Sequence, residues 1–299
     1  MKDDTQKLTL PELSAIPREG GRIVMVTAYD AASARLAEAA GVDVILVGDS
    51  AAMTVLGHDS TVPVTVDEML MLTRAVTRVA RRALVVADMP FGSYQLSEEQ
   101  ALQNAIRFVK EAGADAVKLE GAGRTLTRIS AILDAGIAAM GHVGLTPQSV
   151  TLLGGYRARG RTALEARRIY DEARALERAG CFSVVLEAIP AAVAARISEA
   201  LTIPTFGIGA GASCDGQVLV WHDLLGLTDG HLPRFVKQYA QLAEAIRRAV
   251  EAYAADVRAG RFPEPQHTYT MPEHELARFE SQLEAPDYRP VGTPITEES

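Results

Sequence analysis

Helix-length stretches that end in Ala-Gly alternate along most of the chain with short runs of apolar residues. Ala40-Gly41 leads into the apolar run 42–47, and Ala179-Gly180 leads into the run 181–186. Glycine just past a helix end readily adopts the left-handed conformation that terminates the helix. The β-branched runs that follow are typical of strands buried on both faces, as in a parallel sheet. The alternation therefore predicts an α/β fold.

Eight apolar runs are predicted to be strands and seven amphipathic stretches to be helices. We expect the strands at residues 23–27, 44–47, 84–87, 116–119, 138–141, 183–186, 205–208 and 218–220. We expect the helices at residues 31–40, 66–80, 98–112, 126–135, 164–179, 193–200 and 235–255. Eight strand–helix units in about 250 residues favour a (β/α)8 TIM-type barrel. A doubly wound sheet is the alternative architecture, because little sequence separates the last two predicted strands.

Three segments divide the 299 residues. Residues 1–20 form a leader with a short helix near residues 11–16, and residues 21–272 form a single barrel domain. Residues 273–299 form a charged, proline-containing tail that we expect to be disordered. Long polar loops at residues 58–65 and 144–161 follow the second and fifth strands, and their position suits lids over the mouth of a barrel.

The composition excludes several classes of protein. Apolar residues make up 48% of the chain and charged residues 23%, which excludes a wholly disordered protein. The net charge is −8 and no basic face is evident, which argues against nucleic acid or an anionic membrane as a partner. No apolar run has the length of a membrane span, and we see no signal peptide. The two cysteines lack metal-ligand spacing, so a reducing, cytoplasmic compartment is expected.

Ionisable residues stand where five of the predicted strands end. Four of these strands are followed by an acid and the fifth strand by a histidine: Asp49, Asp88, Glu120, Glu187 and His142. All strands of a parallel barrel open their carboxyl ends on the same face, so we expect these side chains to meet at one mouth. Any one acid could simply cap the following helix. Four acids together repel one another unless a cation lies among them.

A hard divalent cation is the simplest partner for these acids. Asp49, Asp88 and Glu120 follow successive strands, and Mg²⁺ prefers oxygen ligands of this kind. Zinc is the poorer choice, because the set contains one histidine and no suitably placed cysteine. His142 could bind the metal, donate a hydrogen bond to a substrate, or be a buried structural residue.

Lys118 and Glu187 are further candidates for the chemistry. Lys118 lies two residues before Glu120 and hence on the same face of its strand. There it could bind a substrate carboxylate, pair with Glu120 or Asp88, or form a Schiff base. The neighbours of Glu187 are apolar, which raises a carboxyl pKa and suits a general base or acid. An acid at a helix N-terminus is the structural alternative for Glu187.

A set of short motifs follows the strand ends and the two long loops. They are Thr27-Ala-Tyr-Asp30, Val47-Gly-Asp-Ser50, Gly57-His-Asp-Ser-Thr61, Pro63-Val-Thr65, Ala87-Asp-Met-Pro90, Val117-Lys-Leu-Glu-Gly121, Gly141-His-Val-Gly-Leu-Thr-Pro-Gln-Ser149, Gly154-Gly-Tyr156, Leu186-Glu187, Gly207-Ile-Gly-Ala-Gly211 and Asp229-Gly-His231. Together they resemble the ketopantoate hydroxymethyltransferase (3-methyl-2-oxobutanoate hydroxymethyltransferase) family. The resemblance covers residues 22–267, and the chain departs from it in the residues that follow.

The resemblance implies a TIM barrel, a bound Mg²⁺ ion and a homo-oligomer, typically a decamer. It implies that Asp49, Asp88 and Glu120 form the metal site and that Glu187 is the proton acceptor. The residues that it implies for binding the 2-oxo acid are Asp49, Ser50, Asp88 and Lys118.

The implied reaction transfers a hydroxymethyl group from 5,10-methylenetetrahydrofolate to 3-methyl-2-oxobutanoate and gives 2-dehydropantoate, in pantothenate and coenzyme A biosynthesis. Glu187 would remove the C3 proton, and Mg²⁺ and Lys118 would stabilise the resulting enolate. Two alternatives stay open. One is a magnesium-dependent C–C lyase or mutase of the phosphoenolpyruvate mutase or isocitrate lyase type, which needs no folate. The other is a non-catalytic oligomeric relative. The expected partners are small-molecule substrates.

Overall fold

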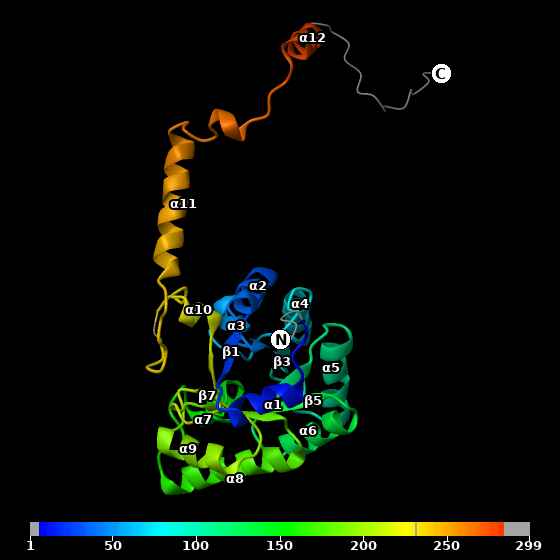
Figure 1. The fold of residues 1–299 in the computed structure, drawn as a ribbon, viewed down its shortest axis with the longest axis vertical. Coiled ribbons are helices and arrows are strands. Elements are labelled where there is room, and N and C mark those ends of the chain that lie inside the picture. Colours follow the sequence, from blue (N-terminus) through cyan, green and yellow to red (C-terminus); the bar gives the residue numbers. More distant parts are fainter. Residues whose placement is uncertain (1–5, 231, 284–299) are drawn as a thin grey trace, which may run out of the picture. The chain divides into compact units, whose positions relative to one another are not determined.

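The strands form a closed parallel barrel. The computed structural model describes residues 6–230 and 232–283. The strands are β1 (Ile23–Thr27), β2 (Val44–Val47), β3 (Leu84–Asp88), β4 (Ala116–Glu120), β5 (Ala138–Gly144), β6 (Ser183–Glu187), β7 (Thr205–Ile208) and β8 (Gly216–Leu219). Each strand pairs with its neighbours in sequence and β8 pairs with β1, so the sheet closes (Figure 1). The predicted TIM-type barrel is confirmed, and the doubly wound sheet was the wrong alternative.

Helices follow most of the strands. The larger ones in the barrel region are α1 (Leu10–Arg18), α2 (Ala31–Ala39), α4 (Val66–Thr77), α5 (Glu98–Lys110), α6 (Thr125–Asp134), α8 (Ala163–Ala179) and α9 (Ala191–Ala200). Short helices occupy the connections: α3 (Ala51–Thr54), η1 (Pro147–Ser149), α7 (Val150–Leu153) and α10 (Trp221–Leu224). The chain continues with α11 (Leu242–Arg258), η2 (Pro265–His267) and α12 (Glu273–Leu283). No helix among the described residues is both long and apolar enough to cross a membrane.

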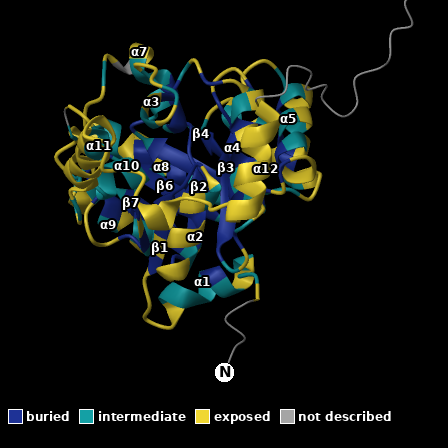
Figure 2. Ribbon diagram, turned by 90° about the horizontal axis from the view of Figure 1, so that it is seen from above, coloured by how far each residue is buried: buried dark blue, intermediate teal, exposed yellow. Residues whose placement is uncertain are grey.

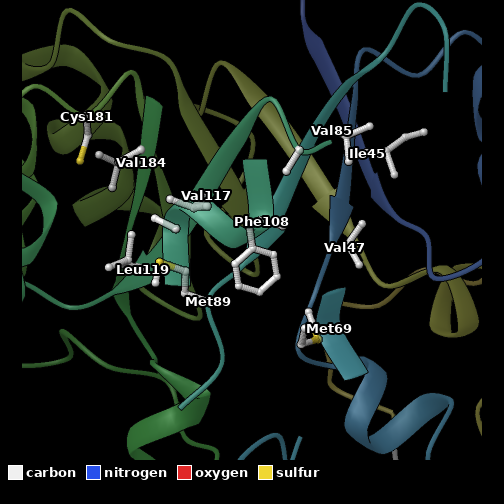
Figure 3. Packing of buried hydrophobic residues seen from close by; sticks show 14 of the residues in the cluster. Ile45, Val47, Met69, Val85, Met89, Phe108, Val117, Leu119, Cys181 and Val184 are labelled. Atoms are coloured by element: carbon white, nitrogen blue, oxygen red, sulfur yellow. The ribbon is translucent and has the colours of Figure 1, made fainter. Parts of the chain in front are cut away.

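Alternation along the strands divides the buried apolar residues into two cores. The first lies between the barrel and its helices and includes Phe108, Met69 and Val117 (Figure 3). The second consists of the side chains that point into the barrel, among them Met140 and Phe206. Colouring by burial shows buried strands surrounded by helices whose outer faces are exposed (Figure 2). Side chains alternate between the two faces of each strand. The position of a residue in this alternation therefore decides whether its side chain points toward the barrel axis.

The last strand begins earlier than the sequence predicts. Strand β8 begins at Gly216, whereas the apolar pattern predicted residues 218–220. Gly216 pairs with Ile23 on one side and with Phe206 on the other. A Cβ atom on Gly216 would lie 2.8 Å from the Ile23 carbonyl oxygen and 2.9 Å from the Phe206 ring. The position needs a residue without a side chain, and for this reason the apolar pattern missed it.

The leader contains a helix, as predicted, and this helix contributes to the core inside the barrel. Helix α1 begins with a capping box in which Thr9 and Glu12 exchange hydrogen bonds. Leu13 of this helix is fully buried and clusters with Ile23, Met25 and other inward-facing strand residues. Residues 1–5 of the leader lie outside the described residues. The helix therefore adds an apolar side chain to the core within the barrel.

The chain divides into two compact units, residues 1–243 and 244–299. The predicted helix at 235–255 was wrong at its start, because α11 begins at Leu242. The backbone N–H groups of Tyr239 and Leu242 instead donate to the carbonyls of Leu224 and Leu225, which holds residues 235–241 out of a helix.

Residues Glu273–Leu283, at the beginning of the predicted tail, form helix α12. This segment begins directly after Pro272, carries Glu273 and Glu275 in its first turn, and continues with good helix formers. Residues 284–299 of the predicted tail and His231 of the Asp229-Gly-His231 motif lie outside the described residues. The division into leader, barrel from 21 to 272 and tail stays a prediction.

Truncation of Leu13 tests the contribution of helix α1 to the interior core. Leu13→Ala should lower the free energy of unfolding by about 2–5 kcal/mol, because it leaves a cavity among buried side chains. Urea unfolding measures the change. The matched control is Leu36→Ala at a side chain of α2 that is 61% exposed, which should change stability by about 0.5 kcal/mol or less. Equal losses in the two variants would contradict the assignment of Leu13 to the core.

Candidate active site

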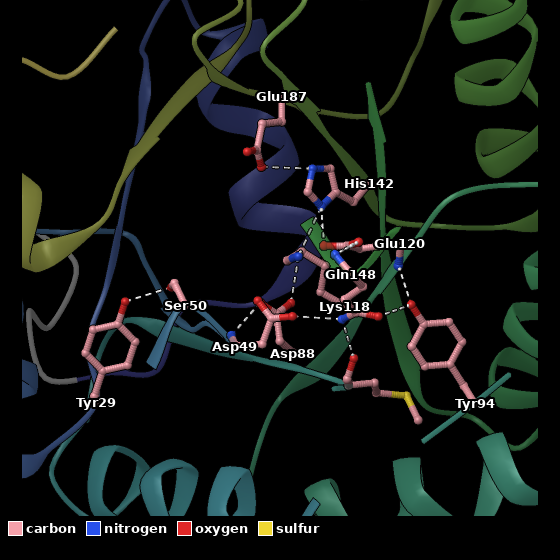
Figure 4. Close-up of polar contacts among 11 residues, drawn as sticks. Tyr29, Asp49, Ser50, Asp88, Tyr94, Lys118, Glu120, His142, Gln148 and Glu187 are labelled. Carbon is pink, nitrogen blue, oxygen red and sulfur yellow. Dashed lines mark hydrogen bonds and ion pairs between the residues drawn. The ribbon is translucent and has the colours of Figure 1, made fainter. Parts of the chain in front are cut away.

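The five predicted strand-end residues all reach one mouth of the barrel. Asp88 pairs in register with Lys118, and Glu120 pairs with His142 on the next strand. Because alternate residues of a strand face the same side, Lys118 and Glu120 both point inward. Figure 4 shows that Asp49 and Glu187 join this group. The expectation that residues distant in sequence converge at the carboxyl ends of the strands is correct.

A buried ion pair occupies the centre of the site. Lys118 Nζ lies 2.7 Å from Asp88 Oδ1, and the two side chains are 4% and 3% exposed. Burial alone would lower the pKa of Lys118, but the neighbouring carboxylates, Asp88 first among them, outweigh burial and raise that pKa. Lys118 is therefore an ammonium ion. Pairing with Asp88 was one of the roles that the sequence left open for this lysine.

More carboxyl groups meet at the site than the single Lys118 ammonium could neutralise if all of them were ionised. Burial and the nearby charge of Asp88 raise the pKa of Asp49 to about 7. Burial and the charge of Asp49 raise the pKa of Glu120 well above its ordinary value. Asp88 and Asp49 are in direct contact, because the Asp49 backbone N–H donates to Asp88 Oδ2 over 3.0 Å. A divalent cation would relieve this repulsion, and carboxylates are the hard oxygen donors that it prefers.

The three predicted ligands do not form a closed cage. Among the described residues, no group of three His, Cys, Asp or Glu side chains is arranged as a metal site. Asp49 and Asp88 touch, whereas Glu120 is connected to Asp49 through Gln148. Mg²⁺ commonly takes one or two carboxylates and completes its shell with water and substrate oxygens. The assignment of Asp49, Asp88 and Glu120 to a metal stays a prediction.

His142 connects the central lysine to Glu187. Its Nδ1 lies 3.3 Å from Lys118 Nζ and 3.6 Å from Glu120 Oε1, and its Nε2 lies 3.2 Å from Glu187 Oε2. Burial and the charge of Lys118 lower the pKa of His142 well below its ordinary value, so the ring is neutral. An ammonium can only donate, so Nδ1 accepts and the proton lies on Nε2. The proton-bearing Nε2 of His142 then lies close to Glu187 Oε2.

Glu187 has the properties of a general base. Its side chain is 15% exposed, and burial raises its pKa to about 7, against the opposing effect of Lys118. The next residue, Ala188, adopts φ = +48°, a left-handed conformation that is uncommon for a residue with a side chain. Backbone hydrogen bonds hold this turn: Ala188 N–H donates to the Ile208 carbonyl, and Ala188 O accepts from Arg159. Strained backbone next to a titratable group is typical of functional sites.

The predicted substrate residue Ser50 lies beside the acids at the end of β2. Its hydroxyl is 2.8 Å from the Tyr29 hydroxyl. Burial, partly offset by hydrogen bonding to Ser50, raises the pKa of Tyr29 to about 12, so this phenol is neutral. Ser50 is thus held by a partner from the loop after β1.

Sequence reasoning missed three site residues, Tyr29, Tyr94 and Gln148. Gln148 is buried, and its side chain donates to Asp49 Oδ2 over 2.9 Å. The Tyr94 hydroxyl donates to Gln148 Oε1 over 2.6 Å and accepts from the Glu120 backbone N–H over 3.2 Å. Tyr29 and Gln148 belong to motifs that were quoted for the family resemblance. Their presence in those motifs was the only sequence signal for them.

The site opens into a cavity of about 1230 Å³. Lys118 and Glu187 are among the residues that line it. His58 and Thr61 of the loop after β2, and Tyr156 of the loop after β5, also line the cavity. The position of the two predicted lid loops at the barrel mouth is therefore confirmed.

Comparison with known proteins identifies the family. The family model described as ketopantoate hydroxymethyltransferase matches residues 7–265. The chain belongs to this family. The prediction from the strand-end motifs is thus confirmed.

The sequences of curated relatives are similar to this chain along most of its length. The 3-methyl-2-oxobutanoate hydroxymethyltransferase of Moorella thermoacetica is 57% identical over 263 residues, which cover 88% of this chain and 98% of the relative. The enzyme of the same name from Thermobifida fusca is 55% identical over 264 residues, which cover 88% and 94%. Identity at this level marks the chain as a member of a family of hydroxymethyltransferase enzymes.

Solved structures show the same fold at low identity. A phosphonopyruvate hydrolase in complex with oxalate and Mg²⁺ matches with a TM-score of 0.57 and 13% identity, covering 92% of this chain and 97% of the other. A 2,3-dimethylmalate lyase of the PEP mutase/isocitrate lyase superfamily matches with a TM-score of 0.54 and 18% identity, covering 92% and 98%. These likenesses concern the fold alone.

Replacing Asp49 by asparagine tests the burial and crowding of the carboxyl groups at the site. The pKa of Asp49 is raised to about 7, so the folded protein binds this proton more tightly than the unfolded chain does. The contribution of Asp49 to stability therefore falls as the pH rises from about 4 to about 7. Without a divalent cation, Asp49→Asn should be more stable than the wild type at pH 8 by about 1–4 kcal/mol. The difference should shrink as the pH falls toward about 4.

Urea unfolding across this pH range measures the effect. Asp171→Asn is the matched control, because the side chain of Asp171 is 53% exposed and lies outside the site. A difference between Asp49→Asn and the wild type that did not vary with pH would contradict the raised pKa of Asp49.

Proposed function

We propose that the protein transfers a hydroxymethyl group from 5,10-methylenetetrahydrofolate to 3-methyl-2-oxobutanoate and so forms 2-dehydropantoate. The identity of the substrate in this proposal is taken from the names of the relatives. The observation that carries the proposal is the placement of Glu187, a largely buried carboxyl with a pKa of about 7, at the same mouth as the Lys118 ammonium. Removing a proton next to a keto group needs a base of this kind and a positive charge for the oxygen.

The 2-oxo acid is bound by Asp49, Ser50, Asp88 and Lys118 in this proposal. Asp49, Asp88 and Glu120 would hold Mg²⁺, which when bound supplies a Lewis acid for the carboxylate and keto oxygens of the substrate. The Lys118 ammonium faces the same space and attracts the negative charge of the substrate. Its ion pair with Asp88 fixes its position before the substrate arrives.

Glu187 accepts the C3 proton of the 2-oxo acid. The C–H bond electrons move toward the keto oxygen, whose growing negative charge is stabilised by Lys118. His142 Nε2 lies 3.2 Å from Glu187 Oε2, and the other oxygen of Glu187 would take the proton. C3 then bonds to the methylene carbon of the folate after the bond from that carbon to N10 breaks, and N10 takes the proton held by Glu187. Water displaces N5 from the same carbon, its oxygen becomes the new hydroxyl group, one of its protons goes to N5, and tetrahydrofolate leaves.

The two loops at the mouth have a protective role in this scheme. Residues 58–65 and 144–161 would exclude bulk water while the carbanion exists. We also propose a homo-oligomer, a decamer by family resemblance, in the cytoplasm. Sedimentation equilibrium tests the assembly.

A magnesium-dependent lyase or mutase is the second candidate, because the chain shares its fold with members of the PEP mutase/isocitrate lyase superfamily. The two candidates differ in their need for folate. An assay that contains 3-methyl-2-oxobutanoate, Mg²⁺ and 5,10-methylenetetrahydrofolate, with each omitted in turn, should give product only in the complete mixture. Turnover without folate would favour the lyase, and no turnover at all would favour a non-catalytic relative.

Glu187→Gln tests the base directly. The amide keeps the shape of the side chain but cannot accept a proton. Exchange of the C3 hydrogen with deuterated water, in the presence of Mg²⁺ and without folate, should fall by about 10²- to 10⁴-fold. NMR measures the exchange. Glu199→Gln, at a side chain that is 62% exposed, is the matched control and should exchange at the wild-type rate. Near-normal exchange in Glu187→Gln would eliminate Glu187 as the base.

The same exchange reaction should depend on pH. Because burial raises the pKa of Glu187 to about 7, the base is protonated and inactive below this pH. At low substrate concentration the exchange rate should fall about tenfold for each pH unit below 7 and level off above it. A rate that stays constant down to pH 5 would contradict the raised pKa of the base.

A further inference from the structure

Gln148 has every hydrogen-bonding group of its side chain engaged at the site. It lies in η1, in the loop after β5, and is 5% exposed. Its Nε2 donates to Asp49 Oδ2 and to the Met89 carbonyl, each over 2.9 Å. Its Oε1 accepts from the Tyr94 hydroxyl over 2.6 Å. A buried amide is stable only when its groups are paired, and here both N–H donors and the oxygen are used (Figure 4).

The partners fix the orientation of the amide. The Met89 carbonyl and the Asp49 carboxylate can only accept, so the NH₂ group must face them. The Tyr94 hydroxyl already accepts from the Glu120 backbone N–H, so its proton is available for Gln148 Oε1. Tyr94 therefore selects the amide orientation that donates to Asp49.

Gln148 also holds a second acid. Its backbone N–H donates to Glu120 Oε2 over 3.0 Å. One residue of a loop thus contacts groups at the ends of three successive strands, β2, β3 and β4: Asp49, Met89 and Glu120. One oxygen of each acid is taken by Gln148, and the other oxygen is left for a cation or a substrate.

We propose that Gln148 is a positioning residue that orients Asp49 and Glu120 for a divalent cation and secures the loop 145–161 over the site. This inference rests on the proposed function, because it assumes that these acids bind a cation. A residue that only anchored the loop would not need to donate to the acids. Hydrogen-bond donors to metal-ligating carboxylates orient the ligands and affect metal affinity strongly.

Gln148→Met tests the role of the amide. Methionine has a similar size, removes the side-chain hydrogen bonds and retains the backbone N–H that binds Glu120. Binding of Mn²⁺ alone, followed by the electron paramagnetic resonance of the free ion, should weaken by about 10- to 100-fold. Turnover should recover when the Mg²⁺ concentration is raised by the same factor, because the base and Lys118 are unchanged.

The matched control is Gln100→Met. Gln100 lies on α5, outside the site, and its Nε2 donates to the Gly92 carbonyl over 2.9 Å. This variant should bind Mn²⁺ as the wild type does. If Gln148→Met does not fold, Tyr94→Phe is the second variant, because it removes the hydroxyl that orients the amide, together with that hydroxyl's contact to the Glu120 backbone N–H. Tyr94→Phe should weaken Mn²⁺ binding by about threefold or more.

The outcomes separate this inference from the proposed function. Wild-type Mn²⁺ affinity in a folded Gln148→Met, or in Tyr94→Phe where Gln148→Met does not fold, overturns the role of Gln148 and leaves the proposed function standing. If the wild type itself binds no Mn²⁺, both the proposed metal role and the inference are wrong. A lowered melting temperature with unchanged Mn²⁺ affinity would show that Gln148 only anchors the loop.

Discussion

The buried ion pair between Lys118 and Asp88 is the interaction on which the rest of the site depends. One ammonium lies within a group of four carboxyl groups, and its charge opposes the rise in the pKa of Asp49, Glu120 and Glu187 that burial causes. The same charge keeps His142 neutral, because it opposes protonation of the ring. Desolvating an ion pair offsets much of its attraction, so a pair at this depth contributes little to stability. Its value lies in presenting a fixed positive charge at the mouth of the barrel.

The barrel produces this arrangement through alternation along its strands. Inward-facing positions lower in the barrel carry apolar side chains such as Met140, Val185 and Phe206, and the last inward positions carry the ionisable groups. The apolar layers supply the low dielectric that raises the pKa of Glu187. The same interior that stabilises the fold therefore tunes the base. A polar substitution in these layers would change both properties together.

The sequence was sufficient to predict the barrel and the convergence of its strand-end residues, because Asp49, Asp88 and Glu120 each follow a clear apolar run. It could not select Asp88 as the partner of Lys118, because that choice depends on the register between β3 and β4. The sequence did not predict a role for Gln148, because this residue lies in a loop without a periodic pattern of apolar residues. The start of α11 was misplaced because backbone pairing with the end of α10 overrides the local helical pattern.

The central claim is that these acids and Lys118 form one site for a divalent cation and a 2-oxo acid. The most direct test is anomalous diffraction from crystals soaked with Mn²⁺ and 3-methyl-2-oxobutanoate. The account predicts one Mn²⁺ peak within coordination distance of Asp49 and Asp88, with the keto acid beside it and C3 facing Glu187. A Mn²⁺ peak away from these carboxylates, or a keto acid bound elsewhere in the cavity, would contradict it.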